Sequence, residues 1–594
     1  MNRLTLALLL ALLGAFPALA QWSPEKTVVL RGKVVSMHKE VKTGRVVIRD
    51  GKVVAIVPLS AGPIPGAVEI ETDGYIYPGL MNLHNHLSYN FLPLLDVPKR
   101  YENRYEWPGG KAYDRYVNDP KTYVTKPDYY DLMEEALKYA EVRAIIGGET
   151  AIQGAEARGA ISSTLVRNVE LENFGRDNVG QNTLGMQNRF YQELDHGGRE
   201  SVLKLDAWFY HLAEGVDELS RKEFSAPDFD PTKKFTTRKS DPNVPGLVEA
   251  GLVFPGLVGI HCTGLKEDDF AQWRQITGEG AKIVWSPTSN LLLYGKTTDI
   301  RAARRQGATI ALGTDWAPSG CRNLLWELKV VAELNREANP PLFENDRQIV
   351  ELVTVNPAKI MHWDDKVGQI RAGFVADLLV VDAIPGAADG YDNLIRATEA
   401  NVQLVMIGGN PLYGDERHME LLKTYGDKAQ YEVLPDSPAG RPKAIDMWED
   451  TSVSKGDLSV AEIRDRLHRA LELNPADVAK EFDARPKYRE KNREWLIGKL
   501  EKAGEEVPAD LAQADSHWST ANVERFLEEK FPNAEPSDQL DPLFTEAGDL
   551  AKIEAVVARQ VDDPQDALDL RAWLTEPVAQ ASHGLAQALS TLGQ

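Results

Sequence analysis

The alternation of apolar, strand-like runs with helix-like segments between about Pro78 and Asp365 constrains the fold of this 594-residue chain more than any other feature. Strands separated by helical segments are typical of parallel βα units, because a parallel pair of strands needs a crossover connection. The sequence therefore predicts an α/β fold with a TIM-like (β/α)₈ barrel over residues 78–365.

Strand-rich segments flank this region on both sides. Val and Ile are dense from Thr27 to Val57 and again at 367–383 and 401–414, with Gly and Asp at the turns. The simplest arrangement joins the two flanks into one small domain. We predict a composite β-sandwich domain built from residues 21–77 and 366–440.

The character of the chain changes from about Arg441 onward. Strand-like runs stop, and Ser459 with Glu462 forms a capping box before Val460, Ile463 and Leu467 at helical spacing. We predict a helical C-terminal extension over residues 441–594. It is either a separate helical domain, or a lid, or an oligomerisation element that would make the protein a homo-oligomer.

The N-terminus has the pattern of a secretory signal peptide. Arg3 precedes an apolar run from Leu4 to Phe16, and Ala18-Leu19-Ala20 is an A-x-A cleavage site before Gln21. A membrane anchor is disfavoured, because the run is shorter than the ~20 residues that span a bilayer. We expect residues 1–20 to be removed and the protein to be exported to the periplasm or the extracellular space.

The net charge of the chain limits the kinds of partner that it can bind. The formal net charge is -22, and such a surface repels phosphate backbones and anionic lipid. We therefore expect a small-molecule substrate, and neither nucleic acid nor, after signal removal, a membrane.

The two cysteines, Cys262 and Cys321, are expected to be free thiols, because alternation along a strand would turn Cys262 toward the outer helices.

Polar side chains recur where predicted barrel strands end, which is where (β/α)₈ enzymes carry their catalytic residues. His84 and His86 are two residues apart after an apolar run, so on a strand they would point to the same face and could share a metal ion. Four of the 11 histidines fall at such places. The further members of the set, in chain order, are His211, Glu214, His261, Ser286, Ser289, Asn290 and Asp315.

The segments that carry this set resemble a known family. PGLMNLHNH, HLAEG, IHC, SPTSNLLLYG and GTDWAPSG, followed by VGQIRAGFVADLLVVD, are similar to the amidohydrolase superfamily, in its cytosine deaminase and triazine hydrolase branch. The resemblance covers roughly residues 27–430. It implies that His84, His86, His211 and Asp315 are metal ligands, that Glu214 shuttles protons, and that His261 orients water and substrate.

Some members of this superfamily hold two metals bridged by a carboxylated lysine on the fourth strand. Here the only lysine on an apolar run before His211 is Lys204, which lies too close to His211 for a strand, helix and two loops to intervene. We therefore expect one divalent metal per chain, zinc in the first place, with iron or manganese as alternatives.

Three residues are candidates for contact with the substrate. Trp316 stands where relatives often carry a small residue, which suggests an aromatic-lined pocket. Asn290 follows a predicted strand. Arg167 ends a predicted third strand, and a structural salt bridge is its alternative role. Residues 87–130 form a long loop rich in Tyr and Trp, which is either a folded surface flap or a substrate lid.

These residue types suit hydrolysis of a carbon–nitrogen bond. A divalent metal lowers the pKa of its bound water to about 7, Asp315 can ligate and accept the water's proton, and Glu214 can carry a proton to the leaving or ring nitrogen. We expect deamination of a cyclic amidine or amide hydrolysis, that is, a hydrolase for carbon–nitrogen bonds other than peptide bonds. The alternatives are a peptidase-like amidohydrolase for acyl-amino acids or dipeptides, and a non-catalytic binding protein on the same barrel.

Overall fold

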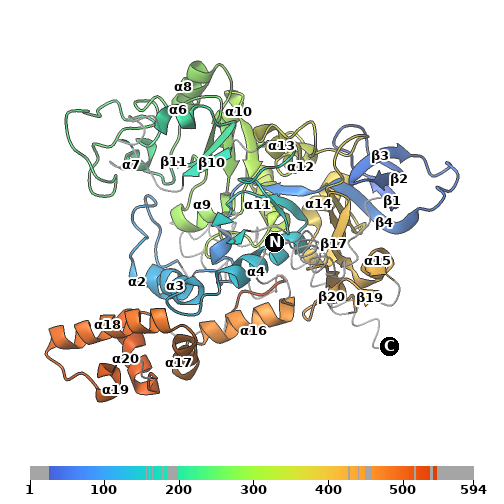
Figure 1. Ribbon diagram of the computed structural model, residues 1–594. Coiled ribbons are helices and arrows are strands. Elements are labelled where there is room, and N and C mark those ends of the chain that lie inside the picture. The colour runs from blue at the N-terminus through green and yellow to red at the C-terminus, as the bar shows by residue number, and fades with distance from the viewer. Residues whose placement is uncertain are drawn as a thin grey trace, which may run out of the picture.

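The fold was analysed in a computed structural model of the whole chain (Figure 1). It describes residues 26–544 except 96, 155–156, 159–160, 163–164, 177–178, 183–190, 192–197, 426–427, 439, 448–457, 514–516 and 535–539. The predicted signal peptide, at residues 1–20, and the end of the C-terminal extension, at residues 545–594, lie outside the described residues. No helix of the described residues is long and apolar enough to cross a membrane.

Parallel strands occupy the region predicted to be a barrel. One parallel sheet has the order β5-β6-β9, and a second has the order β10-β11-β12-β13-β14. Their bounds are β5 Leu80–Asn82, β6 Glu149–Ile152, β9 Arg167–Asn168, β10 Val179–Asn182, β11 Ala207–Leu212, β12 Leu257–His261, β13 Lys282–Trp285 and β14 Thr309–Leu312. Neighbours in each sheet follow one another along the chain, as in βα units, except that the hairpin of β7 (Ala157–Arg158) and β8 (Ile161–Ser162) lies between β6 and β9.

The last strand returns to the first. The Leu83 amide donates to the Leu312 carbonyl (3.2 Å), and Asn85 forms a parallel bridge with Asp315. Side chains of alternating strand positions, such as Phe209, Val258 and Ile260, pack in one core cluster, whereas Trp208 and Tyr210 pack in a second one. The α/β class and the parallel strands are as predicted. The closed barrel remains a prediction, because the described ladder is interrupted between β9 and β10.

Helices lie between and around the parallel strands (Figure 1). Most are short, because each only has to return the chain to the start of the next strand. Their bounds are α4 Met133–Ile146, α6 Arg199–Val202, α7 Glu218–Arg221, α8 Glu267–Thr277, α9 Pro287–Tyr294, α10 Ile300–Arg305, α11 Leu324–Glu337, α12 Asp346–Glu351 and α13 Val355–Ile360.

The two flanking segments meet in one mixed sheet, seen at the right of Figure 1. Its order is β20-β21-β17-β16-β15-β4-β1-β2-β3, and the junction is the antiparallel pair β15–β4. The bounds are β1 Val28–Val34, β2 Lys42–Arg49, β3 Lys52–Val57, β4 Val68–Pro78, β15 Leu378–Val381, β16 Val402–Ile407, β17 Asn410–Asp415, β20 Glu432–Val433 and β21 Lys443–Ile445. The sheet thus joins N- and C-terminal strands and continues slightly past the predicted boundary at 440. The two-layer sandwich and the domain boundaries stay predictions.

The chain after this sheet is helical as far as it is described. The helices are α16 Val460–Leu471, α17 Pro475–Ala484, α18 Pro486–Ala503, α19 Ala509–Ala512 and α20 Thr520–Lys530. The Ser459 hydroxyl accepts from the Glu462 amide, and the Glu462 carboxylate accepts from the Ser459 amide, so the predicted capping box starts α16. These helices lie below α3 (Asp119–Thr125) and α4 in Figure 1.

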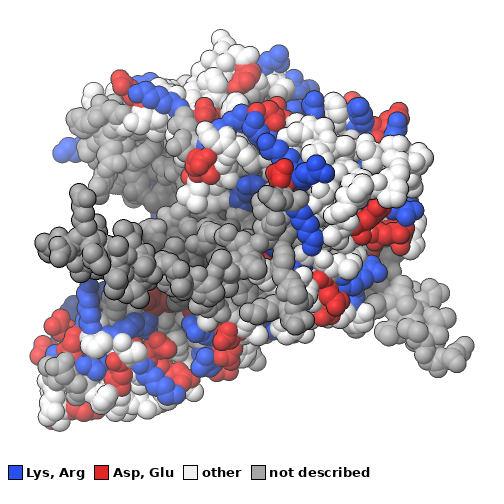
Figure 2. Space-filling model, turned by 45° about the vertical axis from the view of Figure 1, so that its right-hand side comes forward, with Lys and Arg blue, Asp and Glu red and all other residues white. Residues whose placement is uncertain are grey.

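Acidic and basic side chains are interspersed over the face shown in Figure 2, including the C-terminal helices at its lower left. Both cysteines are free and buried, and Cys262 packs in the cluster that holds Trp208 and Tyr210.

Candidate active site

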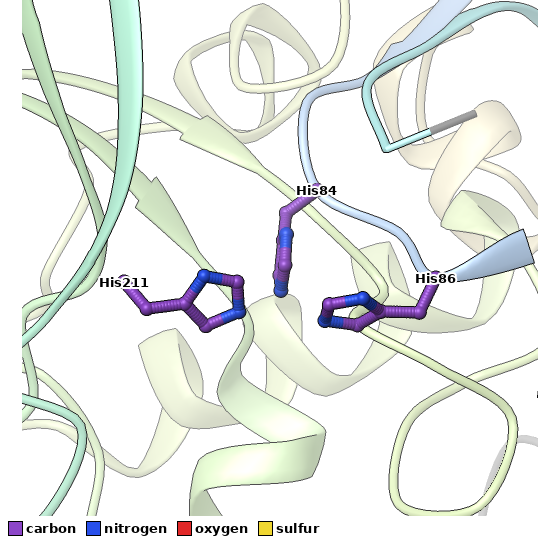
Figure 3. A group of neighbouring side chains, drawn as sticks. All are labelled: His84, His86 and His211. Carbon is purple, nitrogen blue, oxygen red and sulfur yellow. The ribbon is translucent and has the colours of Figure 1, made fainter. Parts of the chain in front are cut away.

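Three histidines converge at one end of the parallel strands (Figure 3). Their rings point toward one another, with centroids 4.8 Å apart for His84 and His86 and 4.6 Å apart for His84 and His211. His211 belongs to β11, but β5 ends at Asn82, so His84 and His86 lie just beyond the strand rather than on it. The bridge between Asn85 and Asp315 keeps this segment extended, so the two rings still share a side as the sequence predicted.

Asp315 closes the group from the end of β14. Its Oδ1 lies 3.1 Å from His84 Nε2 and 3.4 Å from His86 Nε2, and its Oδ2 accepts a hydrogen bond from the Ser289 hydroxyl (2.7 Å). Burial alone would raise the pKa of Asp315, but its hydrogen bond to His84 and the electrostatic effect of the neighbouring histidines outweigh burial and lower the pKa below its ordinary value. The carboxylate is therefore ionised at neutral pH.

The backbone turns sharply at the site. His261 and Asp315 have left-handed φ values of 66° and 63°, and Ala213, between His211 and Glu214, has 50°. Residues other than glycine rarely adopt this region, and where they do the strain is often held at a functional site. At each strand end the turn breaks the strict alternation, so that Ile260 packs in the core while the next side chain, His261, reaches the histidine cluster.

His86, His211 and His261 are kept neutral by their surroundings. Burial, followed by the charge of His84, lowers the pKa of His86 to about 4, and burial lowers the pKa of His261 to about 3. Burial and the neighbouring histidines also lower the pKa of His211 well below its ordinary value. A neutral imidazole is the form that ligates a metal.

The donor set fits a divalent cation. His84, His86 and His211 offer nitrogen atoms within 4.8 Å of one another, as do His84 and His261 with an Asp315 oxygen. His211 Nδ1 and His261 Nε2 are buried and have no hydrogen-bond partner among the described residues. Buried imidazole nitrogens and a carboxylate that converge in this way are the kind of donor set that holds a divalent cation.

A second layer of polar contacts orients His84. The Gln153 side-chain amide donates to Glu170 Oε1 (2.8 Å), which leaves its oxygen facing His84 Nδ1 at 3.4 Å. His84 Nε2 meanwhile faces Asp315 Oδ1 at 3.1 Å, and with a metal bound a proton on Nδ1 would leave Nε2 free to ligate. Such contacts fix the tautomer of ligating histidines in many metal sites.

Glu214 lies buried beside the cluster. Its Oε2 is 3.8 Å from His261 Nε2, and its Oε1 accepts from the Tyr294 hydroxyl (2.7 Å). The Trp107 indole donates to the same hydroxyl (3.1 Å), so Tyr294 accepts from Trp107 and must give its own proton to Glu214. Burial, followed by the charge of Asp315, raises the pKa of Glu214 to about 8. Its carboxyl is protonated at neutral pH, and because Oε1 is occupied by Tyr294, the proton sits on Oε2, toward His261.

The first-strand loop is anchored beside Glu214. The Arg104 amide donates to the Glu214 carbonyl (3.0 Å), and the Val216 amide donates to the Glu102 carbonyl (2.7 Å). The Arg104 guanidinium forms a buried ion pair with Glu223 (3.0 Å). Residues 102–104 are therefore docked on the segment that follows β11, beside Glu214. For residues 87–130 the surface flap and the substrate lid both stay predictions.

Aromatic rings border His86. The Trp316 ring lies 6.2 Å from the His86 ring, 5.2 Å from that of Tyr89 and 5.6 Å from that of Trp107. The Trp316 indole donates to the Ser319 hydroxyl (2.5 Å), which contacts the Ser289 hydroxyl (2.8 Å) that in turn donates to Asp315. Trp316 is thus held at the site, as its predicted substrate role requires.

The other two predicted substrate residues are engaged differently. Asn290 is fully buried, and its oxygen faces His261 Nδ1 at 3.0 Å, so it orients His261. The Arg167 guanidinium donates twice to Asp377, at 2.7 Å and 2.9 Å, which ties β9 to the composite sheet. Arg167 therefore has the structural salt bridge that was the alternative from the sequence, and we withdraw it as a substrate contact.

The sequence did not single out Tyr294, Arg104 or Gln153. Tyr294 ends an apolar helix and Arg104 lies in a loop, and nothing local separates them from ordinary packing residues. Lys204 lies in a turn after α6 and not on a strand, and the fourth parallel strand, β10, contains no lysine, which agrees with the argument against a bridging lysine.

Comparison with known proteins gives a family match over part of the chain. Residues 256–412 match the model of the amidohydrolase family.

The chain has deaminases among its relatives. The chain is 27% identical over 179 residues to a 5-methylthioadenosine/S-adenosylhomocysteine deaminase of Syntrophus aciditrophicus, covering 29% of this chain and 40% of that protein. It is 24% identical over 392 residues to the enzyme of that name from Thermoanaerobacter pseudethanolicus, covering 60% of this chain and 85% of that protein. The match to the first of these thus spans less than half of that relative's length.

The fold is similar to that of a solved adenosine deaminase. The zinc-bound protein from Xanthomonas campestris superposes with a TM-score of 0.51 at 17% identity, covering 74% of this chain and 98% of that one. The family match and the deaminase relatives agree with the superfamily and the branch that the sequence predicted.

Proposed function

We propose that this protein is a one-metal amidohydrolase that deaminates a small, planar ring amidine. The observation that carries the proposal is Glu214: a buried carboxyl, oriented by Tyr294 through Oε1 and facing His261 with Oε2. Ring deamination needs a proton at the ring nitrogen next to the attacked carbon. A protonated carboxyl at this place can supply it.

We further propose that His84, His86, His211 and Asp315 hold the metal, with zinc as the expected ion. A bound divalent ion would supply a water of lowered pKa. Asp315, ionised and fixed by Ser289, would accept a proton from that water. His261, fixed by Asn290, would place its Nε2 against the substrate or the developing oxyanion.

The walls of the site support a flat aromatic substrate. The Trp316 ring lies 5.2 Å from that of Tyr89, 5.6 Å from that of Trp107 and 6.2 Å from that of His86, and such aromatic faces stack on planar heterocycles. A substrate carboxylate would need a cation in the pocket. The Arg104 guanidinium is paired with Glu223 and that of Arg167 with Asp377, whereas the Lys121 ammonium lies over the Tyr89 ring, 4.8 Å from its centroid. The peptidase-like alternative would therefore have to use Lys121, and the non-catalytic alternative would leave the ordered donor set without a purpose.

Metal content and ammonia release test the proposal together. The purified protein should contain one equivalent of zinc, and it should release ammonia from aminopurine nucleosides or amino-triazines but not from N-acyl amino acids. Glu214→Gln should lower kcat and kcat/KM together by about 10²–10⁴-fold, with metal content unchanged. Two tightly bound metals, or a change confined to KM, would contradict the proposal.

We also propose that the protein acts outside the cytoplasm, on the basis of residues 1–20 alone. Sequencing the N-terminus of protein recovered from the periplasm or medium should find Gln21 first. Retention in the cytoplasm with an intact N-terminus would overturn export without affecting the proposed chemistry.

A further inference from the structure

We propose that the C-terminal segment 540–544 is part of the active-site scaffold, with Asp541 as a positioning residue for the two loops that carry His86 and Trp316. This assigns a role to the extension that the proposed reaction does not require. The argument rests on how Asp541 is bound and on what its partners hold.

Asp541 is buried among groups from three elements of the predicted barrel region. Its carboxylate binds the Arg322 guanidinium through two contacts, at 3.0 Å and 2.5 Å, and lies 2.8 Å from an Arg143 nitrogen. Its amide donates to the Phe91 carbonyl (3.0 Å), and its carbonyl accepts from the Tyr139 hydroxyl (2.5 Å). Arg322 follows β14, Phe91 follows β5, and Arg143 and Tyr139 lie on α4.

Arg143 connects Asp541 to the segment that carries His84 and His86. Arg143 also donates to the Asn90 carbonyl. The Asn90 side-chain amide donates to Asn85 Oδ1 (2.7 Å), and the same oxygen accepts from the His86 amide (2.7 Å). Asn85 lies between His84 and His86, so Asp541 reaches this segment through Arg143 and Asn90.

The loop after β14 is tied to the same residues. Asn90 Oδ1 accepts from the Ala317 amide (3.0 Å), and the Leu95 amide donates to the Pro318 carbonyl (2.8 Å). Arg322 then connects this loop to Asp541 directly. Trp316 is the residue before Ala317, so both loops that border the site depend on contacts around Asp541.

Electrostatics explains why the segment must be in place. Arg143 is buried and the Arg322 side chain is only 11% exposed, so removal of Asp541 would leave two guanidinium groups facing each other with little solvent. A buried charge that loses its partner is strongly unfavourable, and the structure moves to relieve it. The movement available here is in the loops that hold Asn90 and Arg322.

Amide hydrogen exchange of the metal-free protein tests the inference without relying on the proposed function. In Asp541→Asn, which keeps the size of the side chain and removes its charge, exchange should rise at least about tenfold in peptides covering 85–92 and 314–322. Arg466→Gln is the matched control. It breaks the ion pair between α16 and Glu135 (3.0 Å), a contact of the extension outside this network, and should leave both peptides unchanged.

Binding of Co²⁺ is a second measurement, which reports on the active site and rests on the proposed metal ligands. With Co²⁺ as the probe, Asp541→Asn should change the visible absorption spectrum and weaken Co²⁺ binding about tenfold, whereas Arg466→Gln should change neither. If Asp541→Asn does not fold, Arg322→Lys keeps the charge but loses the two-point contact and should give the same changes to a smaller degree. A lowered melting temperature with unchanged exchange in the two peptides would overturn the proposal. Failure of Co²⁺ to bind the wild-type protein would instead count against the proposed function.

Discussion

At the scale of single residues, Asp315 has the most demanding position. It faces two histidine nitrogens with Oδ1 and accepts from Ser289 with Oδ2. An asparagine can keep an oxygen toward the histidines, and its amide can donate to the Ser289 hydroxyl, so the fold should tolerate the change. The amide cannot accept a proton from water.

We therefore predict that Asp315→Asn lowers kcat by at least about 10³-fold, with the melting temperature close to that of the wild type and most of the metal retained. Turnover, elemental analysis and thermal unfolding check this. Asp269→Asn, which alters an aspartate paired with Arg221, serves as the control. Near-normal turnover of Asp315→Asn would show that another group accepts the proton.

Tyr294 was not among the site residues predicted from the sequence. Its hydroxyl hydrogen bond lowers the pKa of Glu214 and fixes which carboxyl oxygen carries the proton. In Tyr294→Phe the pKa of Glu214 should rise further, so the alkaline limb of the kcat–pH profile should move to higher pH. Loss of orientation should also reduce kcat by about tenfold at neutral pH.

The pH profile of kcat on the identified substrate tests this prediction. Tyr77→Phe is the control, because it removes a buried hydroxyl bonded to the Gly390 carbonyl in the composite sheet. A reduced rate with an unmoved alkaline limb would mean that Tyr294 only supports packing.

At the scale of elements, the loop that follows β5 forms a wall of the site because it docks on the segment that follows β11. The Arg104–Glu223 ion pair is buried, and Glu223 also accepts from the Ala213 amide (2.8 Å) beside His211. Breaking a buried pair by removing one partner leaves an uncompensated charge.

We predict that Arg104→Met and Glu223→Gln each lower the free energy of unfolding by about 3 kcal/mol, and that the double variant loses less than the sum. Urea unfolding of the four proteins of the cycle measures the coupling. Additive losses would show that the pair does not act as a unit, and the loop would then be held by its backbone hydrogen bonds alone.

The sequence located the segment that carries the predicted metal ligands His84 and His86, but it predicted the wrong secondary structure for that segment. The apolar run and the two histidines in HNH suggested a strand, yet the strand ends at Asn82. The extended geometry of His84 and His86 comes from the contact of Asn85 with Asp315, more than two hundred residues later in the chain. A local pattern cannot contain that information.

At the scale of the whole molecule, stability should depend on pH through the histidine cluster. The folded-state pKa values of His86 and His261 are about 4 and 3, below the ordinary value of 6.5. Between pH 6.5 and 4 the unfolded chain therefore binds protons that the folded chain refuses, and their contribution to stability falls as pH falls. Buried Glu149 and Glu170, with pKa values raised to about 7, act in the opposite direction between about pH 4.5 and 7.

Because these effects oppose each other, we predict how the difference in stability between the wild type and a His86 variant changes with pH. In chelator-treated protein, the free energy of unfolding of the wild type minus that of His86→Gln should decrease as pH falls from 6.5 to 4, by up to ~1.4 kcal/mol per pH unit. Urea unfolding at several pH values checks it, and addition of zinc should increase the difference at pH 7. A difference independent of pH would show that His86 is not held neutral.

The parallel α/β class and the joining of the two flanks could be predicted from sequence patterns, and so could the convergence of a set of polar residues: His84, His86, His211, Glu214, His261 and Asp315. Parallel strands place their carboxyl ends together, so polar residues at successive strand ends meet. Three contacts were visible only in the folded molecule: Tyr294 with Glu214, Arg167 with Asp377, and Asp541 with Arg143 and Arg322. Each of these joins residues far apart in the chain, and their choice of partner depends on burial and charge in the folded molecule, which no local pattern records.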